Sequence, residues 1–84
     1  MIKLYKTPTC PRCAKLKQFL ETLGLQVETF DMTDPTVMTD LYSDGVFVMA
    51  APVLFVDGCY HTTDELFSGN EVNQGAIRQI TGRF

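Results

Sequence analysis

Two cysteines separated by a proline and an arginine, in the run Cys10-Pro11-Arg12-Cys13, restrict the fold of this chain more than any other feature. Proline is tolerated in the first turn of a helix, because the N–H that it lacks would have no partner there. The motif therefore predicts the N-terminus of a helix. Its spacing places both sulfur atoms on the first turn, where they can form a small-ring, reversible disulfide.

The first half of the chain alternates between strand-like and helix-like patterns. Ile2–Lys6 favours a strand, and the helix that follows repeats apolar residues at intervals of three and four up to a stop at Gly24. Residues 26–30 are predicted to form a second strand. Thr33-Asp34-Pro35 combines a capping side chain with a proline, so it predicts a second helix, which Asp44-Gly45 ends.

The second half is predicted to contain two strands and a last helix. Residues 52–56 and 59–62 are strand-like, and Asp57-Gly58 between them favours a two-residue hairpin turn. Residues 64–67 are predicted to form a helical turn. Ser68, followed three residues later by a glutamate, matches a capping box, so we expect the last helix to begin at Ser68.

The predicted order of elements is β-α-β-α-β-β-α, within a single domain of residues 1–84. A helix that connects the first two strands makes them parallel, and the hairpin then adds two further strands. The predicted fold class is therefore α/β, with a four-stranded mixed sheet flanked by three helices.

Charge and hydropathy restrict the partners. A net charge of -3 offers no basic surface for a phosphate backbone, so no nucleic acid partner is expected. The apolar run at residues 46–56 is short and interrupted by Pro52, so no membrane span is expected. No secretory signal follows Met1, and we expect a cytoplasmic protein. Three cysteines in such a chain favour a redox or metal site over a structural disulfide framework.

The position of each cysteine in the predicted helix suggests its role. Cys10 lies where unpaired N–H groups and the positive end of the helix dipole favour a thiolate, so we expect it to be the nucleophile. Cys13 lies deeper in the helix and is expected to be the resolving thiol. Arg12 is expected to point to solvent and to steer an acidic partner rather than to take part in catalysis.

Two alternatives of other classes remain open. Cys10 and Cys13, with Cys59 and perhaps His61, would form a zinc or iron–sulfur site in a metal-binding or adaptor protein. The strand spacing of Cys59 and His61 is unusual for zinc ligands, and Cys59 alone is expected to be a small residue on an edge strand, or otherwise a regulatory thiol. The other alternative is a binding module in which Val46-Phe47-Val48-Met49 docks a protein partner.

The Cys10-Pro11-Arg12-Cys13 motif after a strand, together with Ala51-Pro52 at the start of the third strand, resembles the glutaredoxin and thioredoxin family over nearly the whole chain. The resemblance implies a thioredoxin fold and a dithiol–disulfide oxidoreductase that reduces protein or glutathione mixed disulfides. It also implies a cis peptide bond before Pro52. The backbone of Ala51 would then pair with glutathione or with an extended protein substrate.

The resemblance further implies a set of substrate contacts around the two cysteines. They are Lys6, Pro11, Arg12, Ala51, Pro52, Thr63 and Asp64. The sequence departs from the family here, because two glycines are missing before Asp64 and Lys6 stands one residue further from Cys10 than the family's basic residue. Asp64 has the alternative role of a helix cap.

These departures resemble the short, thioredoxin-like members of the family. The resemblance implies protein disulfide substrates, with ribonucleotide reductase among them. The expected electron donor is glutathione or a reductant of the thioredoxin reductase type. No tightly bound cofactor is expected, and the expected state is a monomer.

Overall fold

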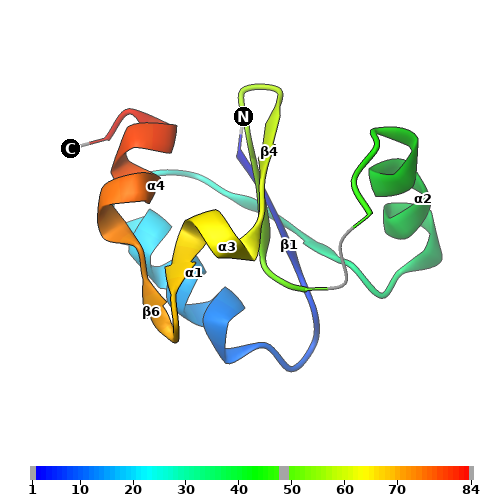
Figure 1. Cartoon of the computed structure of the whole chain (residues 1–84), viewed down its shortest axis with the longest axis horizontal. Helices are drawn as coiled ribbons and strands as arrows, with labels where there is room; N and C mark the ends of the chain where they lie inside the picture. Colours follow the sequence, from blue (N-terminus) through cyan, green and yellow to red (C-terminus); the bar gives the residue numbers. More distant parts are fainter. Residues whose placement is uncertain (1, 48–49, 84) are drawn as a thin grey trace.

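A four-stranded sheet lies at the centre of the computed structural model, which describes residues 2–47 and 50–83 (Figure 1). The helices and strands in chain order are β1 (Ile2–Lys6), α1 (Pro11–Thr22), β2 (Glu28–Asp31), α2 (Pro35–Ser43), β3 (Val53–Val56), β4 (Cys59–His61), α3 (Thr63–Leu66), β5 (Phe67–Ser68), β6 (Glu71–Val72) and α4 (Gln74–Thr81).

The strand order of the sheet is β2-β1-β3-β4. β1 pairs in parallel with β2 and antiparallel with β3, and β3 and β4 form an antiparallel hairpin. The parallel pair requires a crossover, which α1 provides. The predicted mixed sheet is therefore confirmed.

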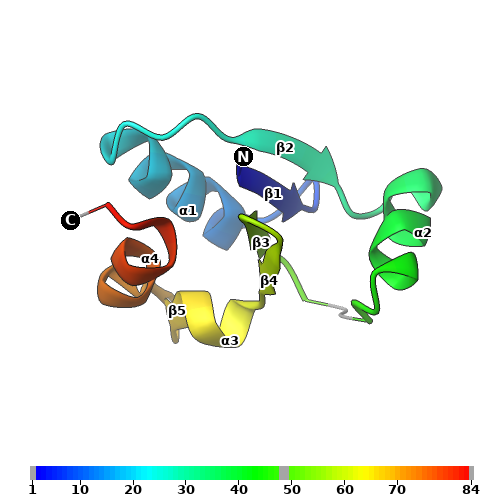
Figure 2. The ribbon, with the colours of Figure 1, turned by 90° about the horizontal axis from the view of Figure 1, so that it is seen from above.

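Successive residues of β1 face opposite sides of the sheet, as the two-residue period of a strand requires. Leu4 belongs to a core that also contains Leu16 of α1, Leu66 of α3 and Ile77 of α4. Tyr5 belongs to a second core with Leu41 of α2. Figure 2 shows the consequence: α1 and α4 lie on one side of the sheet, and α2 lies on the other.

A hydrogen bond at the edge of the sheet helps to hold α2. The hydroxyl of Tyr60 on β4 donates to a carboxylate oxygen of Asp44 at 2.6 Å, and Asp44 is the residue that caps the C-terminus of α2. Burial, reinforced by this bond, raises the pKa of Tyr60 above its ordinary value. The N-terminus of α2 is capped as predicted, since the side chain of Asp34 accepts a hydrogen bond from the backbone N–H of Thr36.

The predicted start of the last helix at Ser68 is wrong. Ser68 is instead paired with Glu71 across the short antiparallel hairpin of β5 and β6. Gly69 in the turn has a φ of 66°, a left-handed conformation that glycine adopts without strain. The capping-box spacing thus also fits two residues that face each other across a two-residue turn. α4 begins at Gln74, with Asn73 as its cap.

The helical turn predicted at residues 64–67 is present as α3, one residue earlier. Its N-terminal cap is Thr62, and Asp64 lies in the first turn. The interpretation of Asp64 as the cap itself is therefore wrong, although an acidic residue in the first turn still favours the helix. No helix within residues 2–47 and 50–83 is long and apolar enough to cross a bilayer.

Candidate active site at the N-terminus of α1

Cys10 and Cys13 form a disulfide at the start of α1, which confirms the predicted bond. Pro11 is the first helical residue, and Cys10 precedes it in an extended conformation as the N-terminal cap. In this position the Sγ of Cys10 accepts a hydrogen bond from the backbone N–H of Cys13 at 3.1 Å. The sulfur therefore lies where the first turn of a helix has N–H groups without helical partners.

The two cysteines differ in their exposure. Cys13 is buried, with 3% of its surface exposed, whereas Cys10 is half-buried and lines a surface cavity. A molecule that approaches from solvent therefore meets Cys10 first.

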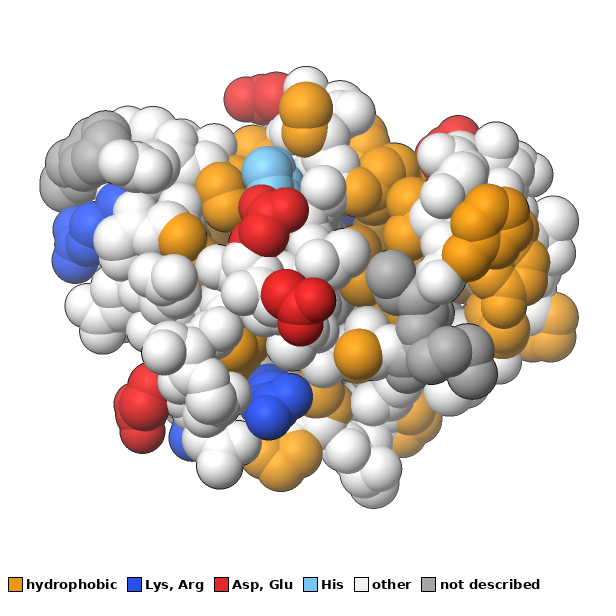
Figure 3. All heavy atoms as spheres, in the orientation of Figure 1, with side chains coloured by type: hydrophobic (Ala, Val, Ile, Leu, Met, Phe, Trp, Pro, Cys, Tyr) orange, Lys and Arg blue, Asp and Glu red, His pale blue; other side chains and the backbone are white. Residues whose placement is uncertain are grey.

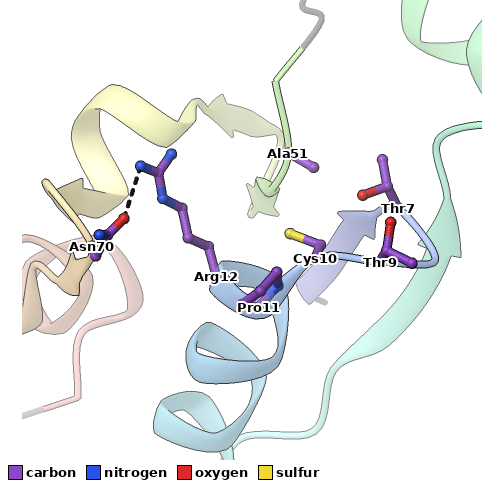
Figure 4. A pocket seen from close by; sticks show the side chains of 7 residues that line it. All are labelled: Thr7, Thr9, Cys10, Pro11, Arg12, Ala51 and Asn70. Atoms are coloured by element: carbon purple, nitrogen blue, oxygen red, sulfur yellow. Dashed lines mark hydrogen bonds between the residues drawn. The ribbon is translucent and has the colours of Figure 1, made fainter.

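The cavity beside Cys10 has a volume of about 390 Å³. Its lining residues come from the loop before α1, the first turn of α1, the segment before β3 and the turn between β5 and β6, and they are Thr7, Thr9, Cys10, Pro11, Arg12, Ala51 and Asn70. Figure 4 shows the sulfur of Cys10 pointing away from the two threonines, toward the side on which Arg12 lies, with Ala51 above it.

The peptide bond between Ala51 and Pro52 is cis, as the family resemblance implied. Pro52 is fully buried, and its carbonyl oxygen accepts a hydrogen bond of 2.8 Å from the hydroxyl of Thr63. Thr63 is itself buried, with 8% of its surface exposed. Thr63 therefore contacts the segment that carries Ala51 and does not line the cavity.

Lys6 and Asp64 also lie outside the lining of the cavity. Lys6 is exposed at the end of β1, opposite Asp31 in the register of the parallel strands. Hydrogen bonds from the hydroxyl and the backbone N–H of Thr33 lower the pKa of Asp31, and the charge of Lys6 lowers it further. Asp64 is exposed on α3, where acidic side chains gather on the surface in Figure 3. Of the predicted contacts, the structure places Pro11, Arg12 and Ala51 around Cys10.

Sequence reasoning missed three residues of the cavity. Thr7 and Thr9 lie in the loop between a predicted strand and the helix that Cys10 begins, so the sequence itself indicates that they lie close to Cys10. Asn70 is distant in sequence, and its only signal was the Gly69-Asn70 pair, which is typical of a tight turn. The capping-box interpretation of the same segment obscured that turn.

Arg12 does not simply extend into solvent. Its Nη2 donates a hydrogen bond of 3.2 Å to the Oδ1 of Asn70, and its guanidinium carbon lies 5.9 Å from the ring centroid of Phe67. The Nζ of Lys15 donates to the backbone oxygen of the same Asn70 at 3.1 Å. The turn between β5 and β6 is thus joined to the first turns of α1.

The metal alternative lacks an assembled set of ligands. Within the described ranges, no group of three or more His, Cys, Asp or Glu side chains lies close enough to hold a metal ion. Cys59 is exposed on β4, and the Nδ1 of His61 lies 2.8 Å from a carboxylate oxygen of Glu65. Cys10 and Cys13 are bonded to each other.

The apolar segment considered for docking is described only in part, because Val48 and Met49 lie outside the described residues. Phe47 is 74% exposed, and its ring stacks on that of Tyr42 with a centroid distance of 5.4 Å. Figure 3 shows hydrophobic side chains gathered at the α2 end of the surface. This stacked pair is not among the residues that line the cavity of Cys10.

Comparison with known proteins adds an independent line of support. The sequence model of the family described as Glutaredoxin matches residues 2–60. An uncharacterized glutaredoxin-like 8.6 kDa protein in the rubredoxin operon of Clostridium pasteurianum is 31% identical over 58 residues, which cover 69% of this chain and 77% of the relative.

Two solved structures show the same fold. The thioredoxin-like protein BC3987 matches with a TM-score of 0.68 at 22% identity, over 95% of this chain and 99% of that one. The glutaredoxin-like protein NrdH-redoxin from Escherichia coli matches with a TM-score of 0.59 at 18% identity, over 73% of this chain and 79% of that one. The predicted thioredoxin fold is confirmed.

Proposed function

Because this chain belongs to the glutaredoxin family, and is on that ground a thiol–disulfide oxidoreductase, we propose that its Cys10–Cys13 pair transfers electrons to disulfide bonds of proteins. The observation that carries the proposal is the unequal exposure of the two cysteines, since Cys10 lines an open cavity and Cys13 is buried. This arrangement suits a pair in which one thiol attacks and the other resolves.

In the first step, the thiolate of Cys10 attacks one sulfur of the substrate disulfide. A bond forms between Cys10 and that sulfur, and the other substrate sulfur leaves as a thiolate. In the second step, Cys13 attacks the sulfur of Cys10, which releases the second substrate thiolate. Two electrons pass from the dithiol to the substrate, and the protons lost by the cysteines match those taken up by the released thiols.

The backbone around Cys10 favours its thiolate in this scheme. The N–H of Cys13 already points at the sulfur of Cys10, and a hydrogen bond to a thiolate is stronger than one to a neutral thiol. The dipole of α1 adds to this effect at the same end of the helix. Cys10 is therefore the thiol that loses its proton and attacks first.

The segment before β3 is the proposed docking edge for an extended substrate. Ala51 lines the cavity next to Cys10, and its backbone groups are suited to pair with a peptide strand. The buried hydrogen bond from Thr63 holds the carbonyl of the next residue, Pro52. The substrate backbone would then pass along Ala51 while its disulfide meets Cys10.

A reductase is the electron donor that the site favours over glutathione. Lys6 and Asp64, two of the residues expected to contact glutathione, do not line the cavity. NrdH-redoxin from Escherichia coli is a glutaredoxin-like protein with a thioredoxin-like activity profile, and we propose the same profile for this chain. Ribonucleotide reductase stays a predicted substrate protein, and cytoplasmic location and a monomeric state stay expectations.

Reduction of the oxidised protein with two electron donors tests the proposal. One reaction contains NADPH, glutathione and glutathione reductase, and the other contains NADPH and thioredoxin reductase, with free thiols as the readout. We expect rapid reduction by thioredoxin reductase and slow reduction by glutathione. Rapid reduction by glutathione alone would contradict the proposed donor, and reduction by neither, with metal bound after anaerobic purification, would favour the metal alternative.

A further inference from the structure

We propose that Asn70 is a positioning residue for Arg12, and that the pair gives this site a preference for disulfides with an acidic residue beside the reactive cysteine. The inference rests on the proposed function, because it concerns the substrate that Cys10 attacks. It assigns a role to the turn between β5 and β6.

Arg12 sets the charge of the cavity. Among the described residues that line it, Arg12 is the only charged one, and the others are threonines, Cys10, a proline, an alanine and an asparagine. A substrate whose sulfur reaches Cys10 and whose backbone follows Ala51 enters the same cavity. Its flanking side chains therefore experience the positive charge of Arg12.

Asn70 restrains the direction of the Arg12 side chain. A free arginine on a helix samples many rotamers, but here the Oδ1 of Asn70 accepts from Nη2 at 3.2 Å, as Figure 4 shows. The ring of Phe67, 5.9 Å from the guanidinium carbon, lies against the same group. The guanidinium is thus held at the wall of the cavity.

The chemical type of residue 70 matters as much as its position. An aspartate there would hold Arg12 by an ion pair and would cancel its charge. The amide of Asn70 is neutral, and its hydrogen bond occupies only one of the guanidinium N–H donors. The charge of Arg12 therefore stays available to a substrate.

The turn that carries Asn70 is itself attached to α1. The backbone oxygen of Asn70 accepts from the Nζ of Lys15 at 3.1 Å. Replacing the Asn70 side chain leaves this backbone contact in place. The side-chain role can therefore be tested without detaching the turn.

The test uses two peptide disulfides that differ only in a glutamate or a glutamine next to the reactive cysteine. The readout is the ratio of their kcat/KM values, with kcat and KM determined separately. For the native protein we expect a preference for the glutamate peptide of about threefold, mainly through a lower KM. This preference should decrease when salt is added, because salt screens the charge of Arg12.

Four variants separate the contributions. Arg12→Gln should abolish the preference, and Asn70→Ala should reduce it by at least about half, because the charge remains but its position is lost. Asn70→Asp, which keeps the acceptor, should abolish the preference by neutralising Arg12. Asn73→Ala is the matched control: it removes an asparagine that caps α4 outside the cavity, and it should keep the native ratio.

The outcomes that overturn the inference are distinct. A native protein that reduces both peptides equally shows no charge recognition. A native ratio in Asn70→Ala, or a ratio altered equally in Asn73→Ala, shows that Asn70 does not position Arg12. Failure to reduce either peptide, or full activity of Cys10→Ser, would instead contradict the proposed function.

Discussion

At the scale of single residues, the site depends on a few hydrogen bonds that fix backbone and sulfur atoms. The N–H of Cys13 points at the sulfur of Cys10, and the hydroxyl of Thr63 holds the carbonyl of Pro52. Neither Cys13 nor Thr63 touches solvent to any large extent. These buried residues therefore determine the position of the groups that face the substrate.

The bond from Thr63 predicts a loss of stability in Thr63→Val. The substitution keeps the volume of the side chain but leaves the buried carbonyl of Pro52 without its donor, which should lower the free energy of unfolding by about 1–3 kcal/mol. Urea denaturation measures this change. The control is Thr62→Val, since Thr62 makes no side-chain capping bond at α3 and a smaller loss is expected. Equal losses in the two variants would contradict the role assigned to Thr63.

Asp31 predicts a dependence of stability on pH. Its pKa in the folded protein is lowered below the ordinary value of 3.8, first by the hydroxyl of Thr33. Because the pKa is lowered on folding, the ionised carboxylate stabilises the fold at pH values above the ordinary pKa. This contribution is lost as the pH falls through the pKa of the folded protein.

Denaturation of the native protein and of Asp31→Asn at several pH values tests this prediction. The difference in stability between the two proteins should be present at neutral pH and should vanish below the folded pKa of Asp31. Thr33→Val removes the hydroxyl that donates to Asp31. The stability of this variant should depend on pH in the same direction as that of the native protein, but less strongly. A difference that does not change with pH would contradict the assignment.

At the scale of elements, the segment between α3 and α4 differs from the prediction, because it forms a hairpin and not the start of a helix. α3 ends at Leu66, the hairpin of β5 and β6 follows, and α4 begins only after Asn73. The side chain of Asn73 accepts from the backbone N–H of Ala76 at 3.3 Å. Asn73 therefore performs the capping role that the sequence pattern assigned to Ser68.

This difference yields a prediction from two substitutions. Asn73→Ala should lower the free energy of unfolding by about 1 kcal/mol, the usual cost of losing a helix cap. Ser68→Ala should change it by less than about 0.5 kcal/mol, because Ser68 is exposed on a strand. Urea denaturation of both variants measures the two values. A larger loss of stability in Ser68→Ala than in Asn73→Ala would contradict this assignment and would favour Ser68 as the helix cap.

At the scale of the whole molecule, local patterns predicted most of the fold, but only part of the site. The proline after Cys10, the capping Asp34 and the Asp57-Gly58 turn each act within a few residues, so a sequence pattern captures them. The contact between Arg12 and Asn70 spans 58 positions in sequence and depends on how the hairpin packs against α1. No local pattern encodes such packing. Lys6 and Asp64, which the family resemblance implied as substrate contacts, lie outside the lining of the Cys10 cavity.

The attack by Cys10 and the resolution by Cys13 are the centre of this account, and trapping the mixed disulfide tests them most directly. The reduced Cys13→Ser variant is mixed with a peptide disulfide, and mass spectrometry of a proteolytic digest locates the adduct. Cys13→Ser combined with Cys59→Ser serves as the control for the exposed third thiol. The account predicts a stable adduct on Cys10 in both variants, whereas an adduct on Cys59, or none on Cys10, would contradict it.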